Sequence, residues 1–363
     1  MAAPKLPRIK WRAGRVPRTA SDETREELTL SASANSLPGR LAGAALALIL
    51  ATGTAQAGDK QVARMTSFGG SCGKCELSGR NLSEARIIGA NFSGAILIGT
   101  NLRSAQLHST VFTGADLTKA DLTDASMTGA NFANANLSNA RLRAVDANGT
   151  YFGAANLSGA DLTELEATGA VFQRATMTEV KLRSAELLGA NFDRANLTRA
   201  DLTDAEAQGA NFQRARMTGA SLRSANLAGA NLARVDATGA DFRDGQMTGA
   251  ILVYGTFRRA SFRSTDLEGA NLIRGDFDGA DFRDADLSRA LLAGADLANA
   301  RGLRQHQIDD ACLDAQTRLP KGLVSRGCAG VRVIIRRMIM PAVPSAPAAP
   351  PAPPAQVRYL LGN

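Results

Sequence analysis

The sequence is poor in histidine and in aromatic residues. Only two His, one Trp and three Tyr occur among 363 residues, and aromatic residues make up 5% of the chain. An ordinary globular core of this size would contain more large rings. His108 and His306 lie far apart in the sequence, so histidines are not clustered for a metal site or a proton relay. The composition therefore favours a narrow interior filled by small side chains.

The sequence also lacks the common motifs of catalysis. It contains neither a phosphate-binding loop nor a recognisable nucleophile motif. Ser71-Cys-Gly-Lys74 has SxxK spacing, but that spacing alone is a weak signal. Most outward Asp residues stand where a side chain would bond the backbone of a turn. We therefore expect no catalytic residue, no bound cofactor and no metal site.

A five-residue pattern runs without a break through residues 75–300. Each unit reads Ala-Asn/Asp-Leu-x-x, with a large apolar residue at every fifth position. This period fits neither an α-helix, with about 3.6 residues per turn, nor a flat strand, with a period of about two. It fits a chain that turns after every unit, so that four units make one square coil. Such coils would stack at the spacing of β-strands, about 4.7–4.9 Å.

Two columns of residues support a coil of four units independently. Phe recurs once per coil from Phe92 to Phe212, and Gly recurs at one corner of most coils from Gly89 to Gly269. A turn that needs a positive φ would select Gly in this way. Beyond Phe212 the Phe column changes to Leu, and Phe reappears two sides away from Phe242 onward. The large residue has moved to the opposite wall, which conserves the core volume.

The Ala-Asn/Asp-Leu-x-x array resembles the pentapeptide repeat family over residues 75–300. The resemblance implies an all-β fold, a right-handed quadrilateral β-helix (a pentapeptide repeat solenoid) with a short C-terminal helical cap. It also implies dimerisation through an end of the solenoid, which is frequent in the family. It says little about function, because members of the family differ widely.

Four cysteines flank the repeat in two pairs. Cys72 and Cys75 precede it, and Cys312 and Cys328 follow it, so stacked coils would separate the pairs by roughly 50 Å. We therefore predict local pairing in an oxidising compartment. A Cys312–Cys328 disulfide would stabilise the fold by about 3 kcal/mol. The CxxC spacing of Cys72 and Cys75 leaves a thiol-disulfide oxidoreductase as an alternative, although a capping disulfide or two packed thiols is the simpler interpretation.

The segments outside the repeat predict export. Residues 1–57 form a leader whose apolar core, residues 41–51, is followed by Ala55-Gln-Ala57, so we expect a signal peptide cleaved after Ala57. The protein would then be periplasmic or secreted; an uncleaved signal anchor in the inner membrane is the alternative. Residues 58–74 are assigned to an N-terminal cap and residues 301–330 to a C-terminal cap, with a short amphipathic helix over 302–312. Residues 331–363 form a basic, Pro-Ala-rich tail.

Arginine recurs at coil spacing in two rows on the expected surface. Like charges stacked at strand spacing are unfavourable unless they are screened. One interpretation is solvated Arg partly paired with Asp193 and Asp236. The other is a row of anion-binding groups for lipid phosphate, lipopolysaccharide or acidic glycan. The candidate residues are Arg174, Arg194, Arg214 and Arg234 in the first row, and Arg223, Arg243, Arg263 and Arg283 in the second row.

These observations predict a non-enzymatic, exported scaffold with a structural or protein-interaction role. The alternatives are a binder of envelope polyanions through the arginine rows and, less favoured, the thiol-disulfide oxidoreductase. Some pentapeptide repeat proteins imitate DNA with acidic surfaces in the cytoplasm. The predicted signal peptide argues against that role here, so we expect no nucleic-acid partner. The sequence does not identify the protein partner.

Overall fold

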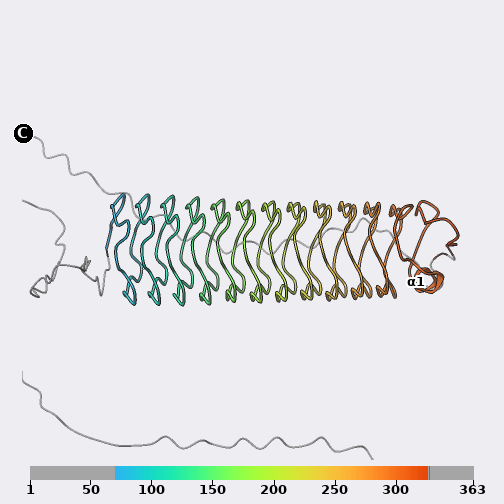
Figure 1. Cartoon of the computed structure of the whole chain (residues 1–363), viewed down its shortest axis with the longest axis horizontal. Helices are drawn as coiled ribbons and strands as arrows, with labels where there is room; N and C mark the ends of the chain where they lie inside the picture. The colour runs from blue at the N-terminus through green and yellow to red at the C-terminus, as the bar shows by residue number, and fades with distance from the viewer. Residues whose placement is uncertain (1–69, 326, 328–363) are drawn as a thin grey trace, which may run out of the picture. The chain divides into compact units, whose positions relative to one another are not determined.

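Residues 70–325 and residue 327 are described by a computed structural model. Parallel bridges join residues twenty positions apart, from Ser71–Asn91 through to Asp281–Arg301. Four bridges recur in each coil, so each coil has four sides, and Figure 1 shows the coils stacked one after another. We number the sides one to four after the bridging residues Asp161, Glu166, Val171 and Thr176. The stacking interval expected from the sequence is confirmed.

Short backbone segments alternate with tight corners throughout the stack. Each side contributes a single bridging residue, and the described residues contain no longer strand. Amide groups next to each bridge donate to carbonyl groups of the following coil, as Leu102 N does to Asp121 O at 2.7 Å. Every corner from Lys74 to Gly294 contains a residue in the left-handed region, for example Gly209 with φ of 63°. The predicted Gly corner is therefore explained by backbone conformation.

Two positions of every unit point inward, as the pattern predicts. Leu102, Ala105 and Leu107 are each fully buried, and the inward positions are buried from Leu82 to Ala300, whereas Arg80 in the first coil is exposed. The Phe residues from Phe92 to Phe212 form one continuous stack, with neighbouring ring centroids 4.8–5.3 Å apart. Offset stacking of this kind adds to the stabilisation from burial.

The second half of the core contains a Phe column that the sequence analysis did not single out. Phe242 stacks on Phe262 at 5.0 Å, as expected, but Phe257 also stacks on Phe277 at 5.1 Å on another side. The two columns meet edge to face, with Phe257 and Phe262 centroids 5.7 Å apart. Gly255 replaces the usual Ala here, because a Cβ on it would lie 2.5 Å from a ring carbon of Phe257.

The C-terminal cap continues the stack in modified form. Helix α1, Gln305–Asp309, is shorter than the predicted span of 302–312 and lies at the end of the last coil (Figure 1). Bridges from Leu291 to Cys312 and from Asp296 to Arg318 extend the stack past the repeat. Buried Gln307 donates through Nε2 to the carbonyl oxygens of Phe282 at 3.0 Å and Ala285 at 2.7 Å. The cap thus satisfies backbone acceptors at the edge of the stack.

Several predictions fall outside the described residues. These are the signal peptide with cleavage at Ala57, most of the N-terminal cap, Cys328 and the tail 331–363. Bridging already begins at Ser71, inside the segment assigned to the N-terminal cap. No helix in the described ranges has the length and apolar character needed to cross a bilayer.

Gly255→Ala tests how tightly the second half of the core is packed. The added Cβ would overlap the ring of Phe257, so the free energy of unfolding should fall by about 1–3 kcal/mol. Urea unfolding followed by circular dichroism measures this change. Gly73→Ala is the control, because the nearest atom to its Cβ would be 3.7 Å away. Adding Phe257→Leu should recover part of the loss; equal effects of the two Gly substitutions would contradict the packing account.

Candidate functional site

The Asn/Asp column holds the corners in place. Asn91 Oδ1 accepts from the backbone N–H of Ser93 at 2.9 Å, and the same bond from residue i+2 recurs along the repeat. Side chains also bond between coils, as Asn211 Nδ2 does to Asn191 Oδ1 at 3.2 Å. These side chains are therefore committed to the backbone and to each other, as the sequence analysis predicts. Contacts with a ligand or partner would therefore be made mainly by the corner residues, whose side chains point outward.

The first arginine row occupies one corner of four successive coils. Arg174, Arg194, Arg214 and Arg234 follow side three, all are exposed, and their φ angles are 57–58°. A left-handed backbone costs a residue other than Gly roughly 1–2 kcal/mol. In earlier coils Gly114 occupies the same corner. The corner itself therefore does not require arginine, and the row is a candidate binding surface.

Acidic groups neutralise little of the first row. Arg194 Nε lies 3.9 Å from Asp193 Oδ2, which also accepts from Gln173 Nε2 at 3.2 Å. Asp236, the other expected partner, instead accepts hydrogen bonds from threonine hydroxyl groups. Among residues 70–325 the structure shows no ion pair for the remaining three arginines of the row. Four guanidinium groups thus stand at strand spacing beside one carboxylate.

Tyr254 extends the first row. The ring of Tyr254 lies between two guanidinium groups, with Cζ of Arg234 5.7 Å and Cζ of Arg274 5.8 Å from its centroid. Arg274 Nη1 also donates to Tyr254 Oη at 3.3 Å. Cation–π contacts of this type orient guanidinium groups without neutralising them. Tyr254 stands twenty residues after Arg234 and twenty before Arg274, and its contacts therefore join Arg274 to the row.

Two of the four arginines in the second row, Arg243 and Arg283, form local ion pairs. Arg243 holds Asp241 in a two-pronged contact, with Nε–Oδ1 of 2.8 Å and Nη2–Oδ2 of 2.5 Å. Arg283 holds Asp281 in the same way. The hydrogen bond from Arg283 is the main reason why the pKa of Asp281 is lowered, and the positive charge of Arg263 adds to it. This row is therefore a weaker anion-binding candidate than the first.

The structure describes both cysteines of the first pair but only one cysteine of the second pair. Cys72 and Cys75 are joined by a disulfide at the start of the stack. Cys72 N donates to Asn91 O at 2.7 Å, so the disulfide lies within the first coil, as a capping role predicts. Cys312 is also disulfide-bonded. Because Cys328 lies outside the described residues, the pairing of Cys312 with Cys328 stays a prediction.

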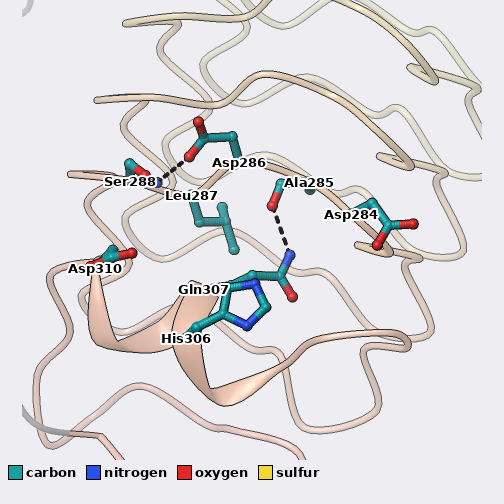
Figure 2. Close-up of a pocket in the computed structure, with 8 residues that line it drawn as sticks. All are labelled: Asp284, Ala285, Asp286, Leu287, Ser288, His306, Gln307 and Asp310. Carbon is teal, nitrogen blue, oxygen red and sulfur yellow. Dashed lines mark hydrogen bonds between the residues drawn. The ribbon is translucent and has the colours of Figure 1, made fainter.

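A small hollow lies between the last coil and α1. Its volume is about 260 Å³, and Figure 2 shows the side chain of Gln307 pointing to the carbonyl of Ala285. Asp286 accepts a hydrogen bond from Ser288 N at 2.8 Å, and His306 lies beside Gln307 on α1 (Figure 2). Within residues 70–325 no group of three His, Cys, Asp or Glu side chains is placed to hold a metal ion. The polar groups here serve the cap.

An acidic column is a feature that the sequence analysis did not identify. Asp146, Glu166, Glu186 and Glu206 bridge one to the next along side two. The three Glu residues are exposed, and no Lys or Arg occurs on side two or its corner in these four coils. The sequence does contain a signal for this column, because four acidic residues recur at intervals of twenty, as the four arginines of the first row do.

Comparisons with known proteins agree with the repeat. A family profile described as pentapeptide repeats matches in eight copies, between residues 75 and 301. The solved structure of HetL, a pentapeptide repeat protein involved in heterocyst differentiation regulation from the cyanobacterium Nostoc sp. strain PCC 7120, is 28% identical. That match covers 60% of this chain and 91% of HetL, with a TM-score of 0.39.

Two further solved structures are similar. AT2G44920, a pentapeptide repeat protein from the Arabidopsis thaliana thylakoid lumen, is 33% identical over 29% of this chain and 70% of its own, with a TM-score of 0.25. QnrB1, a plasmid-mediated fluoroquinolone resistance protein, is 18% identical over 69% of this chain and 94% of its own, with a TM-score of 0.22. A search of curated proteins found no match.

Asp281→Asn tests the local pairing in the second row. Asn keeps the turn bond to Arg283 N but loses the charged contact, so the free energy of unfolding should fall at pH 7. The pKa of folded Asp281 lies below its ordinary value of about 3.9, so its contribution is complete above that pH and is lost as pH falls through the folded pKa. The difference from the unsubstituted protein should therefore shrink below about pH 4. Thermal unfolding across pH measures the difference. Asp116→Asn is the control, because Asp116 bonds Thr118 in the same way but bridges only to uncharged Ile96 and Asn136; a difference that persists in acid would contradict this assignment.

Proposed function

Because the chain belongs to the pentapeptide repeat family, we propose that it acts as a non-enzymatic, exported scaffold with a structural or protein-interaction role. Pentapeptide repeat proteins are generally non-enzymatic structural or interaction proteins. The observation that carries the proposal is the unbroken series of bridges from Ser71 to Arg301. That series aligns outward side chains in straight columns, which suits a surface that is presented to a partner. The right-handed sense of the coil, expected from the family, is part of this proposal.

Export is supported by the sequence of the leader and by the Cys72–Cys75 disulfide, since disulfides persist in oxidising compartments. The test is expression of the full chain in a bacterial host, followed by fractionation and N-terminal sequencing. We expect the periplasmic or secreted form to begin at Gly58. A cytoplasmic protein that retains its leader would contradict export. Retention of the leader on a membrane-bound protein would support the signal anchor instead.

Binding of an envelope polyanion through the first arginine row is the second candidate function. The row carries four guanidinium groups with one nearby carboxylate, whereas Arg243 and Arg283 of the second row are paired with Asp. Guanidinium groups bind phosphate and carboxylate through paired hydrogen bonds. A linear acidic glycan, a lipopolysaccharide or a lipid surface would each present such anions. The redox alternative at Cys72 and Cys75 has no comparable support from the surroundings of the disulfide.

Arg194→Asn/Arg214→Asn tests polyanion binding with little risk to the fold, since Asn134 and Asn139 adopt the same left-handed conformation. Retention on vesicles containing an anionic lipid should fall about tenfold or more, and raised salt should reduce the retention of the unsubstituted protein. Polygalacturonate and lipopolysaccharide, tested separately, identify the source of the anion. Arg243→Asn/Arg283→Asn is the control with equal charge loss. Equal retention of the two variants, or none by the unsubstituted protein, would rule the candidate out.

A further inference from the structure

Charges on side one alternate in sign from coil to coil. Arg141 bridges to Asp161, Asp161 to Lys181 and Lys181 to Asp201, so opposite charges are neighbours along the column. Ion pairs accompany this arrangement, such as Arg183 with Asp201. Opposite charges on adjacent strands are favourable, and like charges are not. This side is therefore arranged for the stability of a single chain.

Two columns depart from alternation in the same part of the stack. The acidic column repeats one negative sign over four coils, and the first arginine row repeats one positive sign over four coils. Three coils carry both: Glu166 with Arg174, Glu186 with Arg194, and Glu206 with Arg214. Each column is repulsive within its own chain. The two share one spacing, because both are set by the same stack of coils.

The two columns cannot neutralise each other within one chain. The acidic column begins side two, and the first arginine row stands at the corner between sides three and four. In a four-sided coil that corner lies diagonally across from the start of side two. The three Glu residues of the acidic column form no ion pair among residues 70–325, whereas Asp146 accepts hydrogen bonds from Ser126, Thr128 and Asn148. The charges of the three Glu and of the first arginine row therefore face outward, where an oppositely charged row of equal spacing from a partner would offset them.

We infer that the first arginine row binds the acidic column of a second copy of this chain, side by side. The guanidinium groups of the row meet the three exposed carboxylates of Glu166, Glu186 and Glu206 in register, because the spacing of strands is identical in the two copies. The two surfaces lie on different sides of the coil, so the contact is heterologous: each copy uses a different surface from its partner. A pair of copies therefore still has one free arginine row and one free acidic column. The association is thus open-ended. This inference rests on the proposed scaffold function and names its partner.

Sedimentation velocity of the purified full-length protein tests the contact. At about 0.01 M salt, where charges are screened over about 30 Å, we expect association that grows with protein concentration; at about 1 M salt, with screening over about 3 Å, we expect monomer. Glu166→Arg/Glu186→Arg/Glu206→Arg and Arg174→Glu/Arg194→Glu/Arg214→Glu should each weaken association at least about tenfold. Arg141 at a bridge position and Glu164 at a left-handed corner show that the fold accepts both kinds of replacement.

Mixing the two charge-reversed variants is the decisive arm, because each supplies the sign that the other lacks, and the mixture should associate while each alone does not. Arg223→Glu/Arg259→Glu/Arg263→Glu changes the net charge equally at exposed positions outside both columns and should still associate. A monomeric unsubstituted protein at low salt would overturn the inference. So would unchanged association of the Glu→Arg variant, which would indicate contact through an end of the solenoid.

The Glu→Arg variant also separates this contact from polyanion binding, because it keeps the first arginine row intact. Retention on anionic vesicles without any self-association in the unsubstituted protein would support the polyanion alone and overturn self-docking. Failure of export would appear instead as an uncleaved leader, and would leave the sedimentation result unaffected.

Discussion

Parallel pairing between residues twenty positions apart is the interaction on which the rest of this structure depends. Each coil takes its hydrogen bonds from the coils on either side, as when Leu202 N donates to Ser221 O and Asp201 N donates to Val180 O. An isolated coil would leave these groups unpaired, which is costly in any buried segment. Stacking therefore places side chains at equal positions of successive coils in columns. The environment of each residue depends on the residues twenty positions before and after it as much as on its neighbours in sequence.

Inside the stack, this constraint means that the side chains of one coil must together fill a core of fixed width. The Phe column from Phe92 to Phe212 leaves room for smaller residues on other sides, whereas two Phe columns in the second half meet edge to face. Gly255 and Gly275 lack the Cβ atoms that would collide with Phe257 and Phe277. A close-packed interior tolerates an enlarged residue only when a neighbour becomes smaller.

On the surface of the stack, the same constraint brings charged side chains of successive coils next to one another in columns. Side one alternates in sign and forms ion pairs between coils, whereas the acidic column and the first arginine row each repeat one sign. Exposed pairs contribute little to stability, so the alternation does not hold the fold together by itself. Its absence in two columns is informative because the backbone there is unchanged. A surface that accepts internal repulsion is suited to an external partner of opposite charge.

Much of the fold followed from the sequence alone, because its periodicity is local and repeated. The five-residue unit, the four-sided coil and the movement of Phe from one wall to the opposite wall at Phe242 could all be predicted. The first arginine row could also be identified, since its members recur at intervals of twenty. The length of α1 could not, because the cap departs from the repeat and its short helix is held against the last coil by Gln307.

What only the tertiary structure decided is which neighbour each exposed side chain contacts. Arg243 turns back to Asp241 in its own unit, Arg183 reaches Asp201 in the next coil, and Tyr254 lies between Arg234 and Arg274. The sequence determined the column in which each residue stands, because backbone pairing fixes that position. It did not determine the direction of a long side chain at a corner, because several partners in three coils lie within reach and their competition is settled by distances in space.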